Sequence, residues 1–389
     1  MNIAFALIPE KGHINPYIGP AQALMDMGHR VVVAAPGPIG PQMQRAGLEF
    51  CPDLISDTPP ERPTSGAELV ALIQDAGRLE QWIEQLLLAD LTDQVRRACA
   101  WYRKERIDIV VADPLYYAGV IAAEQCRLPW ASVSNSLNPV APPTLDSALL
   151  RTLAKLRERR DALFREFGCE PRFCSCDALS PYLTIAFTTE ALVGPPPAGV
   201  TLVGPSFPLH ARGDEVVCVP LPADRPSIYA SFGSQLYYWP ELFRRLLEAG
   251  RRVGAHMVLS IGDLIDCPPW NGPLEDCDVY RYAPQIATLR YAAAFVTHGG
   301  ANSVMEAAAC GVPMLISPMC NDQFHQAYFV ARAGIGRVED LTQAGVDTIA
   351  AHFDRLLQDP EIRQAARRVA ESYRSNGALD TARLVAGLA

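Results

Sequence analysis

The chain has 389 residues, a length that fits two domains better than one. Hydrophobic residues make up 49% of it and charged residues 20%, which excludes a disordered chain and is typical of a globular protein. Acidic residues outnumber basic ones, 43 against 34, so the formal net charge is −9 and we expect no nucleic-acid partner.

The N-terminus predicts a buried strand and not a signal peptide. Residues 2–8 are apolar, but no basic residue precedes them, and no apolar run in the chain is long enough for a membrane span. Eleven cysteines, an odd number, favour reduced thiols and a cytoplasmic protein. Cys169, Cys174 and Cys176 lack the paired short spacing of a zinc site, so we expect no metal there.

The first part of the chain alternates apolar runs with helical patterns. After residues 2–8 come a polar loop, a helix that Asn15 is expected to cap with Pro16 in its first turn, and an apolar run from Arg30. Strand–helix–strand units of this kind indicate a parallel sheet covered on both faces. The same reasoning predicts helices over 68–103, strands at 107–113 and 129–134 with a helix between them, a helical stretch at 145–167, and strands at 182–189 and 200–205.

A second α/β series follows a proline-rich, irregular segment at 206–224, which we interpret as a linker. It contains strands at 227–234, 256–262, 279–284, 294–300 and 314–318, and helices at 240–251, from Ser303, from Asp322 and at the C-terminus. We therefore predict an α/β fold with two Rossmann-like, doubly wound domains that face each other across a cleft, where ligands bind at the carboxyl ends of the strands.

Residues 281–330 carry the most informative chemistry. A strand runs into the glycine turn His298–Gly300 and then into a helix, and such a turn favours a diphosphate. His298 at this turn can add a hydrogen bond or a positive charge. Glu306, one turn inside the helix, suits a vicinal diol such as a ribose, while Asp322 and Gln323 can hold sugar hydroxyls. Each residue alone is common at turns and caps, but the ordered set is not.

This segment resembles the donor-binding signature of the UDP-glycosyltransferase family. The matching elements, in order, are APQ (283–285), THGG (297–300), NS (302–303), Glu306, GVP (311–313) and DQ (322–323). GHINP (12–16) and SFGS (231–234) also fall where the family has them, so the resemblance covers essentially the whole chain. It implies the GT-B fold, with an acceptor-binding domain at 1–205, the linker at 206–224, a donor-binding domain at 225–372, and a C-terminal helix within 373–389 that returns toward the first domain.

The resemblance also assigns roles to residues. It places Gln285 and its neighbours Tyr282 and Ala283 near the nucleobase. The residues that it places at the diphosphate are Ser234, His298, Gly300, Asn302 and Ser303. It places Glu306 on the ribose, and Asp322 and Gln323 on the transferred sugar. Tyr282 and Ala301 depart from the family, since plant members have tryptophan at both positions. A carboxylate at 306 favours a UDP-sugar over a deoxythymidine carrier, which lacks the ribose 2′-hydroxyl.

His13 and Asp113 each follow a predicted strand, so both belong to the carboxyl edge of one parallel sheet. A histidine with a pKa near 7 suits a general base, and a carboxylate behind it fixes its tautomer. From these residues alone, a helix cap and a turn before Pro114 are the simpler interpretation. The resemblance implies the catalytic pair, in which the base deprotonates the acceptor hydroxyl for in-line displacement of the nucleotide.

The predicted function is inverting transfer of a hexose, glucose first, from a UDP-sugar to a hydroxyl group of a lipophilic small molecule, with no cofactor and no metal. We place the acceptor beside Trp82, Tyr116, Tyr117 and Asn135. Two alternatives stay open, a nucleotide-sugar epimerase and a non-catalytic nucleotide-sugar-binding partner of another enzyme. The protein is expected to be a monomer or a homodimer.

Three further features are interpreted as structural. Asp276 and Asp278 mimic a metal-binding DxD motif, but they lie in a stretch that predicts a solvated turn. The arginine-rich helix at 151–165 is either a solvated face or a weak contact with a membrane surface, and its mixed charges favour the former. The remaining histidines, at 29, 210, 256, 325 and 352, show no partner pattern.

Overall fold

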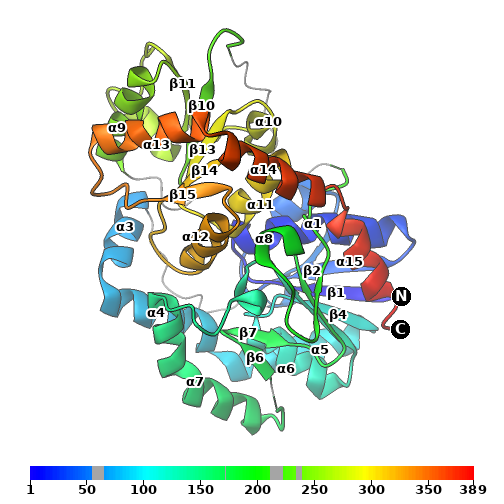
Figure 1. The fold of residues 1–389 in the computed structure, drawn as a ribbon. Coiled ribbons are helices and arrows are strands. Elements are labelled where there is room, and N and C mark those ends of the chain that lie inside the picture. Colours follow the sequence, from blue (N-terminus) through cyan, green and yellow to red (C-terminus); the bar gives the residue numbers. More distant parts are fainter. Residues whose placement is uncertain (55–64, 171, 211–221, 234–238) are drawn as a thin grey trace.

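The computed structural model describes residues 1–54, 65–170, 172–210, 222–233 and 239–389 (Figure 1). Each half of the chain forms its own parallel sheet, and β6 (Arg172–Cys174) pairs with β7 (Asp177–Leu179) in a small antiparallel hairpin. The predicted α/β fold with two doubly wound units is therefore confirmed. The predicted linker is described only at its two ends, 206–210 and 222–224.

The first sheet has seven parallel strands in the order β3-β2-β1-β4-β5-β8-β9. Their bounds are β1 (Asn2–Ala6), β2 (Arg30–Ala34), β3 (Glu49–Cys51), β4 (Ile109–Ala112), β5 (Trp130–Ser134), β8 (Leu183–Ala186) and β9 (Val200–Leu202). The strand order reverses between β1 and β4. In an open parallel sheet the carboxyl ends on either side of such a reversal flank the ligand crevice.

Helices cover both faces of this sheet. They are α1 (Lys11–Asp26), α2 (Gly40–Arg45), α3 (Gly66–Gln74), α4 (Ala76–Leu88), α5 (Leu91–Lys104), α6 (Tyr117–Cys126), α7 (Ala148–Glu166) and α8 (Glu190–Val193), with 3-10 turns η1 (Pro52–Leu54) and η2 (Asn138–Val140). On β1, Ile3 and Phe5 pack in the same core as α1, whereas Ala4 and Ala6 pack in the core of α5 and α6. Burial on both faces explains why the strands are continuously apolar.

The second sheet has six parallel strands in the order β12-β11-β10-β13-β14-β15. They are β10 (Ser227–Ser231), β11 (His256–Ser260), β12 (Cys277–Tyr280), β13 (Ala294–Thr297), β14 (Met314–Ile316) and β15 (Gly336–Val338). Its helices are α9 (Pro240–Arg252), α10 (Gln285–Leu289), α11 (Ala301–Cys310), α12 (Gln323–Arg332), α13 (Val346–Gln358) and α14 (Pro360–Ser372), with the 3-10 turn η3 (Gly262–Asp266). Here too the order reverses, between β10 and β13.

The two halves share an interface. Helix α1 contacts α11, and α8 contacts both α12 and α14. The last helix, α15 (Gly377–Ala386), packs along α1, so the end of the chain lies on the first half (Figure 1). Gly19 allows this approach, because a Cβ atom there would stand 2.1 Å from the Phe207 carbonyl oxygen and 2.8 Å from the Cβ of Ala378.

The sequence missed several elements. It did not predict β15 or the β6–β7 hairpin, and it started α11 two residues late. The expected cap at Asn15 is wrong. Helix α1 begins at Lys11, because the Glu10 carbonyl already accepts the first helical hydrogen bonds, and the side-chain oxygen of Asn15 instead accepts from Gln42.

Two prolines inside α1 free two carbonyl groups. Pro16 has no N–H to donate to the carbonyl four residues earlier, that of Gly12, and Pro20 likewise leaves the carbonyl of Pro16 without its helical partner. Side chains from elsewhere bond to both. Ser206 donates to the Pro16 carbonyl at 2.5 Å, and two asparagines donate to that of Gly12. The two prolines thus leave two carbonyl groups of α1 free to accept hydrogen bonds from side chains outside the helix.

Candidate functional site

His13 and Asp113 lie together at the carboxyl edge of the first sheet. His13 is in the first turn of α1, directly after β1, and Asp113 directly follows the neighbouring strand β4. The Nδ1 atom of His13 is 2.6 Å from an oxygen of Asp113, whose other oxygen accepts from the backbone of Leu115. Asp113 is fully buried, while 23% of the His13 side chain is exposed. The carboxylate therefore orients the ring, and the ring reaches the surface.

The pKa of His13 is set by opposing effects. Burial lowers this pKa, but the charge of Asp113 and its hydrogen bond raise it by more, to about 9. Asp322 and Glu10 act in the same direction as Asp113. The imidazole therefore holds a proton at neutral pH in the free protein.

The glycine turn after β13 encloses His298. Added Cβ atoms at Gly233 and Gly300 would stand 2.8 and 2.7 Å from the imidazole ring, so the two glycines make room for it. Gly299 has a φ of 85°, a conformation that favours glycine. Burial lowers the pKa of His298 to about 4. Of the two roles left open by the sequence, the ring is therefore suited to hydrogen bonding and carries no positive charge.

Three predicted donor residues bond to one another beside this turn. The side-chain amide of Gln285, at the start of α10, donates to Glu306 at 2.6 Å and lies 3.3 Å from the Ser303 hydroxyl oxygen. Glu306 is 3% exposed and Ser303 7% exposed. This places a buried carboxylate at the inner end of the turn, where the sequence predicted a ribose partner.

Lys11 crosses from the first half to the predicted nucleobase position. Tyr282 is 44% exposed, and the ammonium group of Lys11 lies over its ring, 5.2 Å from the centroid. Next to it, the backbone N–H of Ala283 donates to Ser260 at 3.3 Å. Lys11 and Ser260 were not predicted as site residues.

The Gly12 carbonyl joins the two halves at the site. Asn135, after β5, donates to it at 2.7 Å, and Asn302, in the first turn of α11, donates to it at 3.0 Å. The N-terminus of α11 thus lies against the turn that carries His13. Asn135, predicted to contact the acceptor, and Asn302, predicted to contact the diphosphate, therefore both bond to the Gly12 carbonyl oxygen.

Asp322 and Gln323 open α12 as the sequence indicated. Burial raises the pKa of Asp322, while the nearby His325 and His13 lower it. Gln323 is 5% exposed, and its side-chain oxygen accepts from the backbone N–H groups of residues 319 and 320. That oxygen shapes the turn before α12, and the side-chain amide nitrogen of Gln323 donates to the Cys320 sulfur at 3.4 Å.

Two of the four predicted acceptor residues belong to the core. Tyr117 is 1% exposed, donates to the Cys176 carbonyl at 2.8 Å and packs edge-on against Phe164 and Phe173. Tyr116 is 4% exposed and packs in the same core. The prediction that they line the acceptor site is wrong, because α6 is buried nearly all round and turns both rings inward.

The other two acceptor candidates keep exposed surface. Trp82 on α4 is half-buried against the core of the first half, and Asn135 bonds to the Gly12 carbonyl, next to His13. Ser234, predicted to approach the diphosphate, lies outside the described residues. Its role stays a prediction, although Gly233, the residue before it, contacts the His298 ring as described above.

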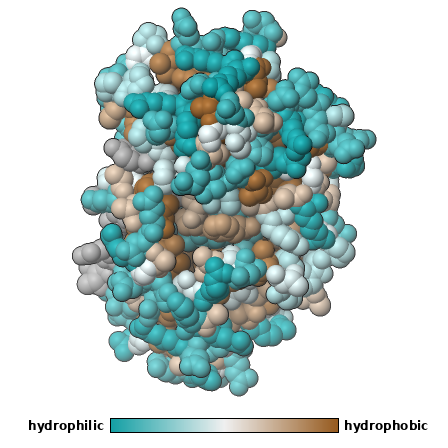
Figure 2. Space-filling model, turned by 60° about the vertical axis from the view of Figure 1, so that its left-hand side comes forward, coloured by the Kyte–Doolittle hydropathy of each residue, from teal (hydrophilic) through white to brown (hydrophobic). Residues whose placement is uncertain are grey.

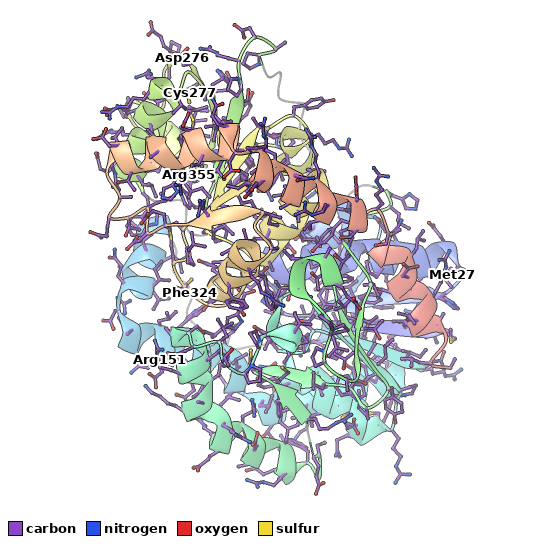
Figure 3. The ribbon with its side chains drawn as sticks, viewed as in Figure 1. Met27, Arg151, Asp276, Cys277, Phe324 and Arg355 are labelled. Atoms are coloured by element: carbon purple, nitrogen blue, oxygen red, sulfur yellow. The ribbon has the colours of Figure 1, made fainter. Side chains whose placement is uncertain are left out.

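The features interpreted as structural all have partners. Asp276 pairs with Arg225, and it lies at the end of the second half that is remote from the first half (Figure 3). Asp278 belongs to β12, not to a solvated turn, and bonds to His256 at 2.9 Å. Within the described ranges, no group of three or more His, Cys, Asp and Glu side chains is arranged to hold a metal ion.

The remaining histidines, which show no partner pattern in the sequence, have partners in the structure. His210 lies 3.1 Å from Asp26, and His352 lies 3.1 Å from Glu339. His29 is close to the N-terminal amine. His325 is fully buried and bonds across to the first half. The sequence missed these pairs because their partners come from other elements.

The arginine-rich helix α7 is neutralised by acidic residues. Lys155 bonds to Glu80 at 2.6 Å, and Arg159 bonds to Glu84, both on α4. Arg160 is 6% exposed and lies over the ring of Phe173. This pairing favours the solvated-face interpretation. None of the helices in the described part of the chain is both long and apolar enough to span a bilayer.

The chain is similar to known glycosyltransferases. Residues 275–379 match the family model described as "Erythromycin biosynthesis protein CIII-like, C-terminal domain". The NDP-glycosyltransferase YjiC of Bacillus subtilis (strain 168) is 23% identical over 98% of this chain and 95% of its own. The oleandomycin glycosyltransferase of Streptomyces antibioticus is 26% identical over 99% of this chain and 90% of its own.

Solved structures show the same fold. A calicheamicin glycosyltransferase superposes with a TM-score of 0.76 at 22% identity, over 100% of this chain and 97% of that one. A glycosyltransferase of Streptomyces sp. SF2575, solved with thymidine diphosphate, gives a TM-score of 0.71 at 22% identity, over 100% and 99% of the two chains. The predicted GT-B arrangement is confirmed by this likeness.

Proposed function

We propose that this chain, which is similar to known glycosyltransferases over its whole length, is a UDP-dependent glycosyltransferase that transfers a hexose from a UDP-sugar to a hydroxyl group of a lipophilic small molecule. Glucose is the first candidate sugar. The observation that carries the proposal is the His13–Asp113 pair at 2.6 Å, which faces the N-terminus of α11 through the Gly12–Asn302 hydrogen bond.

His13 acts as the general base. The acceptor hydroxyl gives its proton to Nε2 of His13, while the Nδ1–H group of the ring keeps its hydrogen bond to Asp113. The acceptor oxygen attacks the anomeric carbon in line, and the bond between that carbon and the diphosphate oxygen breaks. One displacement inverts the configuration at that carbon. Asp113 stabilises the imidazolium that forms, as its effect on the pKa of His13 supports. The base works only when it begins unprotonated.

The leaving diphosphate is stabilised by neutral donors. The backbone amides of the Gly299–Gly300 turn and the N-terminus of α11 supply partial positive charge. Asn302 and Ser303 add side-chain donors, and His298 adds a hydrogen bond, since its lowered pKa keeps it neutral. The cation Lys11 lies over the ring of Tyr282, at the predicted nucleobase position, and is not one of these donors. The proposed reaction therefore needs no metal ion.

The buried carboxylate of Glu306 supports a ribonucleotide donor. A carboxylate accepts hydrogen bonds from two vicinal hydroxyls, whereas a 2′-deoxyribose offers one fewer. Gln285 already donates to Glu306, so the pair presents an ordered polar edge beside the ring of Tyr282. Asp322 and the Gln323 amide then meet the hydroxyls of the hexose.

The acceptor lies on the first-half side of the cleft. Figure 2 shows apolar side chains gathered at mid-height, between hydrophilic upper and lower parts of the molecule. This surface supports a lipophilic aglycone. Trp82 and Asn135 are the two predicted residues with exposed atoms on the elements of this side.

The proposal is tested by product analysis. The protein is incubated with UDP-glucose and a panel of hydroxylated polyketide, flavonoid and carotenoid aglycones, with and without EDTA. We expect a β-glucoside by mass spectrometry and NMR, at a rate that EDTA does not change. An α-glucoside would contradict the single displacement. Epimerised nucleotide sugar, or UDP-glucose bound and left unchanged with every aglycone, would favour one of the two alternative functions.

A further inference from the structure

A buried chain of hydrogen bonds links the two halves behind the candidate site. His325, on α12, is fully buried. Its Nδ1 lies 2.8 Å from the side-chain oxygen of Asn138, and its Nε2 lies 3.2 Å from the Ser147 hydroxyl. Asn138 in turn donates to Asp177 at 2.8 Å, and Ser134 bonds to the same carboxylate at 2.5 Å. Every member of this chain is at least nine-tenths buried.

The direction of each hydrogen bond is fixed by the groups at the two ends of this chain, the Asp177 carboxylate and the Leu150 N–H. The Asn138 side-chain nitrogen donates to Asp177, so its oxygen must accept, and Nδ1 of His325 must carry the proton. The Ser147 oxygen accepts from the backbone of Leu150 as the cap of α7, so its hydroxyl hydrogen is available to Nε2. His325 is thus a neutral ring of one tautomer, consistent with burial lowering its pKa.

His325 connects the segments that carry donor-side and acceptor-side residues. Asp322 and Gln323 precede it on α12, within one helical turn, so the ring is rigidly attached to the predicted sugar-binding turn. Asn138 belongs to η2, three residues after Asn135, in the segment that joins β5 to α7. Figure 3 shows Phe324, the neighbour of His325, projecting from α12 toward the start of α7 near Arg151.

We propose that His325 is a positioning residue for glycosyl transfer, which fixes the sugar-binding turn of α12 against the acceptor-side segment 135–147. This inference rests on the proposed function. The ring touches neither substrate. It acts by setting the distance between the anomeric carbon, held from α12, and the acceptor oxygen, held from the first half. Water needs no such alignment, so the contact favours transfer to the acceptor over hydrolysis of the donor.

The alternative is that His325 only stabilises the interface. A stabilising residue would change the amount of folded enzyme, and with it transfer and hydrolysis equally. A positioning residue changes their ratio. The ratio of glycoside formed to free glucose formed, measured in one reaction, therefore separates the two roles.

The experiment compares His325→Phe with His325→Asn. Phenylalanine removes both hydrogen bonds, whereas the asparagine side-chain nitrogen occupies the place of Nδ1 and can still donate to Asn138. UDP-glucose is the donor and para-nitrophenol the acceptor, at a pH where this phenol is ionised, so that proton removal by His13 is not required. His352→Phe, which removes the contact with Glu339 on the outside of the second half, is the matched control.

We expect His325→Phe to lower the ratio of transfer to hydrolysis by roughly tenfold or more, with UDP affinity by calorimetry unchanged. His325→Asn should retain most of the wild-type ratio, and His352→Phe all of it. An unchanged ratio in His325→Phe would overturn the proposal, whatever its melting temperature.

Ser147→Ala keeps the test valid if His325→Phe does not fold. It removes the hydroxyl that donates to Nε2, together with the cap of α7, and leaves the bond between Nδ1 and Asn138 in place, so we expect a smaller fall in the same ratio. An unchanged ratio in Ser147→Ala would count against the proposal. Wild-type protein that transfers glucose to no acceptor and hydrolyses no UDP-glucose would instead contradict the proposed function.

Discussion

Each half of the molecule carries a histidine at the carboxyl edge of its parallel sheet, and the surroundings shift the pKa values of the two in opposite directions. His13 and His298 each follow a central strand of a parallel sheet, at the carboxyl edge where the strand order reverses. Asp113 lies behind the first and raises its pKa to about 9. The second is enclosed by glycines, and burial lowers its pKa to about 4.

The difference shows how one architecture separates two tasks. A base must gain a proton during the reaction, and a carboxylate behind it stabilises the protonated form. A donor that faces a diphosphate benefits from a ring held in one place, with backbone amides around it. The sheet edge positions the histidine, and the neighbouring residues determine its charge.

Replacing Asp113 removes the cause of the raised pKa and should have the largest effect. Asp113→Asn should lower kcat by roughly 10²- to 10⁴-fold, because the imidazolium loses its partner. In the wild-type enzyme, kcat/KM should rise with pH until about 9, as His13 loses its proton. In the variant, burial still lowers the pKa of His13 and only the weaker charges of Asp322 and Glu10 oppose it, so the profile should move to lower pH.

Asp278→Asn is the matched control for this comparison. Asp278 also bonds to a histidine, His256, at 2.9 Å, but far along the second sheet in β12. Its replacement should leave both kcat and the pH profile unchanged. An Asp113→Asn profile that still rises up to about 9 would show that Asp113 does not set the pKa.

The glycine enclosure is broken by Gly300→Ala. A Cβ atom there would stand 2.7 Å from Nε2 of His298, so the ring must move from its position. We expect UDP affinity by calorimetry to fall by roughly 10- to 100-fold, as one or two diphosphate contacts are lost. Gly272→Ala, at a site with no atom within 4 Å, should leave the affinity unchanged. Wild-type affinity in Gly300→Ala would contradict the role of this turn.

The choice of nucleotide depends on Glu306. The wild-type protein should bind UDP more tightly than dTDP, and Glu306→Gln should reduce that preference by roughly tenfold, since one charged hydrogen bond to the ribose is lost. Competition calorimetry with the two nucleotides measures it. Ser303→Ala, which alters the same helix face without removing the carboxylate, should keep the preference. Equal affinity of the wild-type protein for UDP and dTDP would show that Glu306 does not select a ribonucleotide.

The smallest expected effect concerns Pro16. Pro16→Ala restores an N–H that can donate to the Gly12 carbonyl and compete with Asn135 and Asn302. The donor KM should change by about two- to fivefold, the value of one weakened hydrogen bond. Pro20→Ala makes the same change one turn later, where the carbonyl accepts from Ser206, and should leave this KM alone. Equal effects of both would mean that the prolines act only on helix stability.

The sequence predicted the parts of the site that depend on local pattern. Apolar runs and the glycine turn placed His13, Asp113 and the 298–306 segment at strand ends, and the structure places them there. The start of α1 was misplaced because Asn15 and Pro16 resemble a cap. In the structure the helix begins earlier, at Lys11, and Pro16 leaves the Gly12 carbonyl without a helical hydrogen bond.

The parts that the sequence missed depend on contacts between distant residues. His325 and Asn138 are 187 positions apart, and no local signal links them. Tyr116 and Tyr117 were misassigned because a helix that is apolar all round does not reveal which face meets the cleft. The raised pKa of His13 could not be predicted, because it depends on the contact with the buried Asp113, and the sequence does not show that contact.

The central claim is tested most directly by His13→Ala, assayed for glucose transfer to an alcohol acceptor and for UDP binding in the same preparation. The account predicts that transfer falls by at least roughly 10²-fold while UDP affinity stays at the wild-type value, because the donor is held by the other half. Transfer at the wild-type rate would contradict the assignment of the base and, with it, the proposed mechanism.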